Sequence, residues 1–355
     1  MNFKKDEILV LLGAGASKQA GIPTSVDMIN DIESLLATEW REYKGLYNYI
    51  KSAIFYADGV VGRFDPSNYN IERLVNVLIE LEKKEEHIIY PFIGNWNMKL
   101  TELAGVDFKK IGDFRKVIIS KLQKWLSVDK YERAAYLQKL VGFKNEYNFP
   151  LRIFTLNYDL CIERNCVNAA TVVRGFNDDR EWDWKLFEDN PNCPVDIYLY
   201  KLHGSIDWTT DETESLTYVD DFGKIEAGRL RLIFGTNYKM QYIDPFLFFV
   251  YEFRRYSLES KIILTIGYGF GDEHINGIIA QALKADGGRK LLCVAPFRES
   301  VTEERRRDSI REILQINRSD QVSVERSGAK EFLESQISLE RLRLLFPKTV
   351  DNAPF

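Results

Sequence analysis

Four short segments place chemically useful residues where strands and helices meet. The segments are GAGAS at 13–17, TLNYD at 155–159, KLHGS at 201–205 and GYGFGD at 267–272. Glycines permit a sharp turn and the close approach of a phosphate, and a side-chain amide can hold a hydroxyl or a water. An imidazole exchanges protons near neutral pH. These groups suit chemistry on a sugar that carries phosphate.

Each segment also has a structural interpretation. A G-x-G-x-x-G fingerprint would need glycine at position 18, where this chain has Lys18, so GAGAS either binds phosphate or forms a tight turn. Asp159 and Asp272 either contact a ligand or cap the helix that follows. His203 is either a general base or a structural histidine at the rim of a sheet. The sequence leaves these alternatives open.

The elements that position these segments follow from the apolar pattern. An apolar run at 8–12 leads into GAGAS, segments from about 43 to 144 have helical spacing, and short apolar runs return after Pro150. This pattern predicts an α/β fold, a Rossmann-like doubly wound, mostly parallel sheet with an inserted all-helical module. We expect residues 1–40 and 146–355 to form the Rossmann-type domain and 41–145 the module. Within the module, Glu72 is expected to be a solvated charge in the first turn of a helix.

Composition excludes several classes of protein. The 355 residues include 48 basic and 53 acidic side chains, a net charge of −5, which argues against strong direct nucleic-acid or anionic-lipid binding. The four cysteines form no C-x-x-C pair and the three histidines do not cluster with them, so we expect no metal. No apolar stretch is long enough for a membrane span or a signal peptide, and we expect a cytoplasmic protein.

Taken together and in this order, the segments resemble motifs of the sirtuin superfamily, more closely its bacterial sirtuin-like branch than the histone deacylases. GAGAS and the following AGIP resemble the family's NAD pyrophosphate loop, TLNYD its T-x-N-x-D motif, and KLHGS the strand end with the catalytic histidine. GYGFGDEHIN at 267–276 and NIERL at 70–74 resemble adenosine-side motifs of the bacterial branch. The resemblance covers nearly the whole chain.

The resemblance implies roles for individual residues. Asn157 would orient a ribose hydroxyl or a water, Asp159 would contact the nicotinamide amide, and His203 would act as a base on a ribose hydroxyl. The residues that it assigns to NAD binding are Gly13, Ala14, Gly15, Ala16, Ser17, Thr24, Thr155, Gly267, Tyr268, Gly269, Phe270 and Asp272.

Departures from the deacylases favour hydrolysis. Thr24 and Ser25 stand where deacylases have phenylalanine and arginine, and the zinc ribbon is missing. We therefore expect an NAD hydrolase (NADase) that releases nicotinamide and ADP-ribose. The alternatives are an NAD-dependent protein deacylase and a non-catalytic subunit that binds NAD or ADP-ribose.

The resemblance also implies a biological setting. Such bacterial hydrolases resemble anti-phage defence effectors that deplete NAD on infection. Because uncontrolled hydrolysis would kill the host, we expect control by assembly into a large homo-oligomer. A hexameric DNA-translocating ATPase is the expected partner.

Overall fold

A parallel sheet forms the centre of the protein. The computed structural model describes residues 2–62, 69–83, 89, 92, 97–105, 107–127, 131–210, 215–226, 229–230, 232 and 244–347. Within these residues, seven strands pair in parallel in the order β3-β4-β2-β1-β7-β8-β9. Their bounds are β1 Ile8–Leu12, β2 Leu151–Thr155, β3 Val172–Val173, β4 Ile197–Lys201, β7 Ile262–Ile266, β8 Lys290–Val294 and β9 Val322–Glu325. The predicted doubly wound parallel sheet is confirmed.

The sheet is covered on both faces because its strands are apolar on both sides. In β1, Ile8, Val10 and Leu12 belong to one hydrophobic core, whereas Leu9 and Leu11 belong to a second. Alternate residues of a strand point to opposite faces, so an uninterrupted apolar strand requires helices above and below it. Local sequence thus specifies a buried parallel strand.

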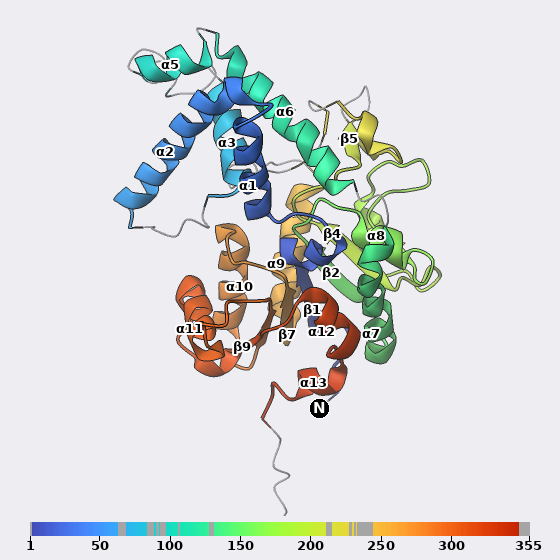
Figure 1. Ribbon diagram of the computed structural model, residues 1–355. Helices are drawn as coiled ribbons and strands as arrows, with labels where there is room; N and C mark the ends of the chain where they lie inside the picture. The colour runs from blue at the N-terminus through green and yellow to red at the C-terminus, as the bar shows by residue number, and fades with distance from the viewer. Residues whose placement is uncertain are drawn as a thin grey trace, which may run out of the picture.

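The helices divide between the two faces. The first core takes in η6 (Tyr131–Gln138), α7 (Lys139–Tyr147), α8 (Cys161–Cys166), α12 (Ala329–Ser335) and α13 (Leu339–Arg343). The second core takes in α9 (Phe246–Glu259), α10 (Glu273–Ala285) and α11 (Glu303–Leu314). Figure 1 shows α10 and α11 on one side of the sheet and α7 and α12 on the other.

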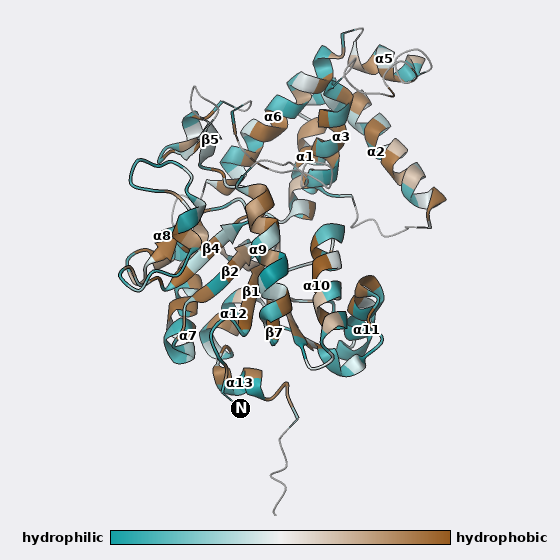
Figure 2. Ribbon diagram, turned by 180° about the vertical axis from the view of Figure 1, so that it is seen from behind, coloured by the Kyte–Doolittle hydropathy of each residue, from teal (hydrophilic) through white to brown (hydrophobic). Residues whose placement is uncertain are grey.

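A helical layer lies over one end of the sheet (Figure 1). It contains α1 (Ser25–Leu36), η3 (Arg41–Tyr43), α2 (Lys44–Val60), α3 (Ile71–Glu82), α5 (Met98–Ala104) and α6 (Lys109–Leu126). In α3 the buried Ile71, Leu74, Val75 and Leu78 form one stripe, which packs between α1 and α6. In Figure 2 these helices show both brown and teal turns, as expected for amphipathic helices.

Contacts between helices cross the predicted domain bounds. Helix α1, which precedes residue 41, packs against α3, and η6, which precedes residue 146, packs against α8. The division of the chain into a Rossmann-type domain and an inserted module at residues 41 and 146 stays a prediction.

Short elements complete the described structure. A hairpin of β5 (Trp208–Thr210) and β6 (Leu216–Tyr218) lies beside the main sheet. The remaining 3-10 turns are η1 (Ala14–Ala16), η2 (Lys18–Ala20), η7 (Trp184–Phe187), η8 (Phe222–Lys224) and η9 (Ser319–Gln321). None of the described helices combines the length and the apolar character that a membrane span requires.

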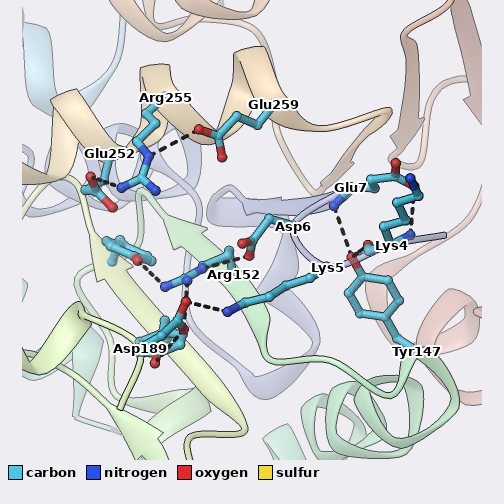
Figure 3. A network of polar contacts seen from close by, with 12 residues as sticks. Lys4, Lys5, Asp6, Glu7, Tyr147, Arg152, Asp189, Glu252, Arg255 and Glu259 are labelled. Carbon is cyan, nitrogen blue, oxygen red and sulfur yellow. Dashed lines mark hydrogen bonds and ion pairs between the residues drawn. The ribbon is translucent and has the colours of Figure 1, made fainter. Parts of the chain in front are cut away.

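A buried arginine organises the amino-terminal edge of the sheet. Arg152, the second residue of β2, is 2% exposed and its guanidinium donates to Asp6 Oδ1 at 3.0 Å and to the Tyr200 hydroxyl at 3.0 Å. Its guanidinium also lies 4.0 Å from the ring centre of Tyr198. Figure 3 shows Arg152 reaching between Asp6 and Asp189. This network joins the chain before β1 to β2 and to the loop before β4.

We predict that Arg152→Met destabilises the protein by about 3–5 kcal/mol, because it leaves Asp6 without its buried partner. Chemical denaturation measures the change. Lys99→Met, which removes an exposed pair with Glu102, serves as the control and should cost no more than about 1 kcal/mol. If the two variants lost equal amounts of unfolding free energy, the stabilising role assigned to Arg152 would be wrong.

Glu252 on α9 provides a pH-dependent test (Figure 3). Burial raises the pKa of its carboxyl although Arg255 opposes the change. Because the raised pKa means that the folded protein favours the protonated carboxyl, ionisation of Glu252 at pH 7 costs stability. That cost falls as pH drops through the raised folded pKa and disappears below the ordinary glutamate value of about 4.3.

We therefore predict that Glu252→Gln raises the melting temperature at pH 7 and that the gain vanishes near pH 4. Glu259→Gln is the control, because Glu259 also accepts from Arg255 but is exposed. A gain that is the same at both pH values would show that charge burial is not its cause.

Candidate active site

The four segments singled out from the sequence meet at one edge of the sheet. Parallel strands all end at the same edge, and a crevice opens where the strand order reverses, here between β1 and β7. A cavity of about 1820 Å³ lies at this edge. Its wall includes Gly13 after β1, Asn157 after β2, His203 after β4 and Gly267 after β7. It also includes Glu72 from the helical layer.

Two glycine turns form the floor of this cavity by packing backbone against backbone. A Cβ on Gly13 would lie 2.6 Å from the Gly267 carbonyl oxygen, and one on Gly267 would lie 2.1 Å from the Ala16 nitrogen. Gly267 also has a φ of +67°, which favours glycine. The glycines are therefore required because the turns after β1 and β7 touch.

Most backbone amides of the first glycine turn donate hydrogen bonds to other backbone groups of the protein. Gly13 N–H donates to Ile266 O and Gly15 N–H to Gly267 O, both at 3.0 Å. The amides of Ala16 and Ser17 donate to carbonyls within the turn. Within residues 13–17 this leaves the amide of Ala14, which lines the cavity, to meet a ligand. The turn offers fewer donors than the sequence pattern indicated.

Asn157 joins the loop after β2 to this turn. Its Nδ2 donates to Ser17 Oγ at 3.0 Å, and its backbone N–H donates to Thr155 Oγ1 at 3.1 Å. The Asn157 side chain is 9% exposed and lines the cavity, whereas Ser17, Thr155 and Ala16 lie outside the wall. Of these predicted ligand contacts, Asn157 lines the cavity, and Ser17 and Thr155 form hydrogen bonds with Asn157.

Asp159 accepts a hydrogen bond at the start of a helix and also lines the cavity. Its Oδ1 accepts from the Cys161 amide at 3.0 Å at the start of α8, and the residue also lines the cavity. Its carbonyl accepts from the buried Lys201 ammonium, which pairs with Glu163 Oε1 at 3.0 Å. Lys201 thus fastens the loop after β2 to the strand that precedes His203.

His203 lies between two carboxylates. Its Nε2 is 3.1 Å from Asp272 Oδ2, and its Nδ1 is 3.7 Å from Glu72 Oε1. Asp272 Oδ1 meanwhile accepts from the His274 amide at 3.0 Å, so Asp272 caps α10 and contacts the imidazole at once. Burial raises the pKa of Tyr158 well above its ordinary value, which keeps this neighbouring phenol neutral.

Glu72 is the functional candidate that sequence reasoning missed. We expected a solvated charge, but its side chain is 23% exposed and faces His203. Glu72 and His203 are far apart in the chain, so no local spacing connects them. The resemblance of NIERL to a family motif was the one signal at this position.

The other predicted contacts also lie on the cavity wall. Ala14, Gly15, Thr24, Tyr268, Gly269 and Phe270 all line it. Thr24 caps α1 in a capping box with Asp27, and Tyr268 donates to Asn276 Oδ1 at 2.8 Å. The cavity continues between α10 and α11 past Lys284 and Arg306, which the sequence analysis did not name. Their roles as ligand contacts stay predictions.

The glycine contact leads to a test of the site's framework. We predict that Gly267→Ala lowers the free energy of unfolding by roughly 1–3 kcal/mol or more, since its Cβ meets backbone atoms and its φ is positive. Gly269→Ala is the matched control, because its Cβ meets no atom within 4 Å. Denaturant titration should separate the two variants, and equal stability would show that the two turns do not need their close contact.

Among the described residues, no group of three or more His, Cys, Asp or Glu side chains is placed to hold a metal ion.

Comparison with known proteins extends this picture. No curated protein matches the chain significantly. A mutant Sir2 homologue in complex with 2′-O-acetyl ADP ribose is similar over 96% of this chain and 94% of its own, with 13% identity and a TM-score of 0.44. A Sir2 homologue–NAD complex is similar over 95% and 88%, with 14% identity and a TM-score of 0.41.

The family comparison covers the part of the chain from β2 to beyond α11. Residues 151–317 match the model of the SIR2-like domain. This range includes Asn157, Asp159, His203 and the loop after β7. This part of the chain is therefore similar to the SIR2-like domain.

Proposed function

We propose that this protein is an NAD hydrolase that cleaves the nicotinamide–ribosyl bond and releases nicotinamide and ADP-ribose. The observation that carries the proposal is the common cavity of Asn157, His203 and the glycine turn, in a chain whose residues 151–317 match the SIR2-like domain. These are the groups that would orient a ribose, accept its proton and lie against a diphosphate.

The size and the polar groups of the cavity suit a dinucleotide. Its volume of about 1820 Å³ exceeds the roughly 300–1,000 Å³ of pockets for drug-sized ligands, so a dinucleotide can lie along it. At the glycine turn, the Ala14 amide and the Lys18 ammonium supply groups for a diphosphate, although Lys18 also pairs with Asp27 at 3.2 Å. Nicotinamide and its ribose would lie beside Asn157, Asp159 and His203.

The reaction needs no external oxidant or reductant. The C–N bond between ribose and the cationic nicotinamide breaks, and its electron pair leaves with neutral nicotinamide. His203 takes a proton from a ribose hydroxyl as positive charge develops on the sugar. Asn157 orients a water that attacks the anomeric carbon. His203 then returns its proton to the ribose hydroxyl, and the excess proton of the attacking water is released to solvent with ADP-ribose.

The residues that follow His203 are buried, which favours water as the acceptor of the ADP-ribosyl group. Ser205, Ile206, Asp207 and Trp208 are each at most 2% exposed. We take this burial to favour a small acceptor such as water over an extended acylated peptide. Hydrolysis is therefore preferred over transfer to an acyl group.

The wider setting rests on the family resemblance. We propose that the hydrolase is an anti-phage effector, that it assembles into a large homo-oligomer, and that a hexameric ATPase controls it. A mixture of the two purified proteins, tested for co-elution and for NAD loss, addresses this part separately.

We predict that the wild-type protein converts NAD into equal amounts of nicotinamide and ADP-ribose without any peptide. Asn157→Ala and His203→Ala should each lower kcat by about 100-fold or more, because each removes a group that acts on the ribose. His274→Ala, at an exposed histidine in the first turn of α10, is the control and should retain full activity.

Product analysis separates the alternatives. An O-acyl ADP-ribose formed only with an acylated peptide would identify a deacylase. NAD or ADP-ribose binding by calorimetry with no product, with or without the ATPase, would identify a non-catalytic binding subunit. Either outcome would overturn the hydrolase proposal.

A further inference from the structure

We propose that Glu72 and Asp272 are positioning residues that act through His203, because together they hold the imidazole ring and stabilise the proton that it takes up. The inference deepens the proposed hydrolase function and rests on it for its catalytic consequence. It gives the helical layer a part in the chemistry, since Glu72 belongs to α3 and the other two residues follow strands of the sheet.

The distances define how the ring is held. A neutral imidazole carries one N–H group. Asp272 Oδ2 lies 3.1 Å from Nε2 of His203, which is within range to accept a hydrogen bond from an N–H at that nitrogen. Nδ1 then carries the lone pair and can accept a proton. Glu72 Oε1 lies 3.7 Å from Nδ1, beyond ordinary hydrogen-bonding range but close enough to attract a proton bound there.

The position of Glu72 is fixed from both sides. Asn70 Oδ1 caps α3 by accepting from the Arg73 amide at 2.9 Å, and the Arg73 guanidinium donates twice to the buried Asp58 carboxylate. Ile71 and Leu74 are buried in the core of the helical layer. These contacts fix the rotation of the first turn of α3 about the helix axis. They therefore also fix the direction in which the Glu72 side chain points.

Asp272 is fixed in the same way. One carboxylate oxygen caps α10, which leaves the other directed at His203. Tyr158 packs beside the ring, and its hydroxyl is neutral because burial raises its pKa. Among the described residues, Asp272 and Glu72 supply negative charge next to the imidazole.

This arrangement has a defined consequence for the reaction. When His203 takes the proton of a ribose hydroxyl, the bonding pair remains on the hydroxyl oxygen and the ring becomes an imidazolium. That cation forms between two carboxylates, which favour it over the neutral ring. Loss of either carboxylate should slow the step without removing the groups that bind the dinucleotide.

The kinetic test compares three variants in α3. We expect Glu72→Gln to lower kcat for NAD by about 10- to 100-fold with KM within about threefold of wild type. Glu72→Asp should retain more activity than Glu72→Gln, because it keeps the charge. A packing or hydrogen-bonding role predicts the opposite order, since glutamine has the shape of glutamate. Glu80→Gln, which removes a charge paired with Lys83 farther along α3, should leave kcat unchanged.

A second measurement does not depend on turnover. The chain has three histidines, so ring signals in a nitrogen-15 NMR titration can be assigned with the His203→Ala and His274→Ala variants. The His203 ring should titrate at lower pH in Glu72→Gln than in wild type, and Glu80→Gln should leave its midpoint unchanged. Thermal melting confirms that each variant is folded.

The outcomes separate the two proposals. If the wild type does not hydrolyse NAD but the His203 midpoint falls in Glu72→Gln, the hydrolase proposal fails and the role of Glu72 toward His203 stands. If the wild type hydrolyses NAD while Glu72→Gln leaves both kcat and the midpoint unchanged, the inference about Glu72 is wrong.

Discussion

The contact between the turns after β1 and β7 is the constraint on which the cavity depends. Gly15 donates its amide to the Gly267 carbonyl, and the two backbones lie too close for a Cβ on Gly13 or Gly267. Because the two turns pack closely against each other, they leave space for the cavity at the edge of the sheet where the strand order reverses. A side chain at this contact would separate the turns and alter the floor of the cavity.

The polar side chains that line the cavity belong to segments that buried polar contacts hold in place. Lys201 fastens the loop that carries Asn157, and Asp272 divides its two oxygens between a helix cap and His203. Such groups need partners when they are buried, since an unpaired charge is costly. The polar contacts therefore fix geometry as well as balance charge.

The helical layer completes the site as well as covering it. Glu72 reaches His203 from the first turn of α3, whose direction depends on the Asn70 cap and on the packing of Ile71 and Leu74. A shift of the layer against the sheet would move Glu72 relative to the imidazole. The cavity thus takes residues from two structural layers, and its geometry depends on how those layers pack.

The sequence by itself determined the parallel sheet and the positions of Asn157, Asp159 and His203 at strand ends, because apolar runs and the turns after them are local signals. It also located the glycine turns, since only local spacing is needed to see them. Tertiary structure alone decided that Glu72 lies beside His203, that Asp272 serves both a helix and an imidazole, and that the amides of Gly13 and Gly15 are used by β7. Those facts depend on how distant segments pack, and the spacing of residues along one segment carries no information about the side chains that another segment brings to it.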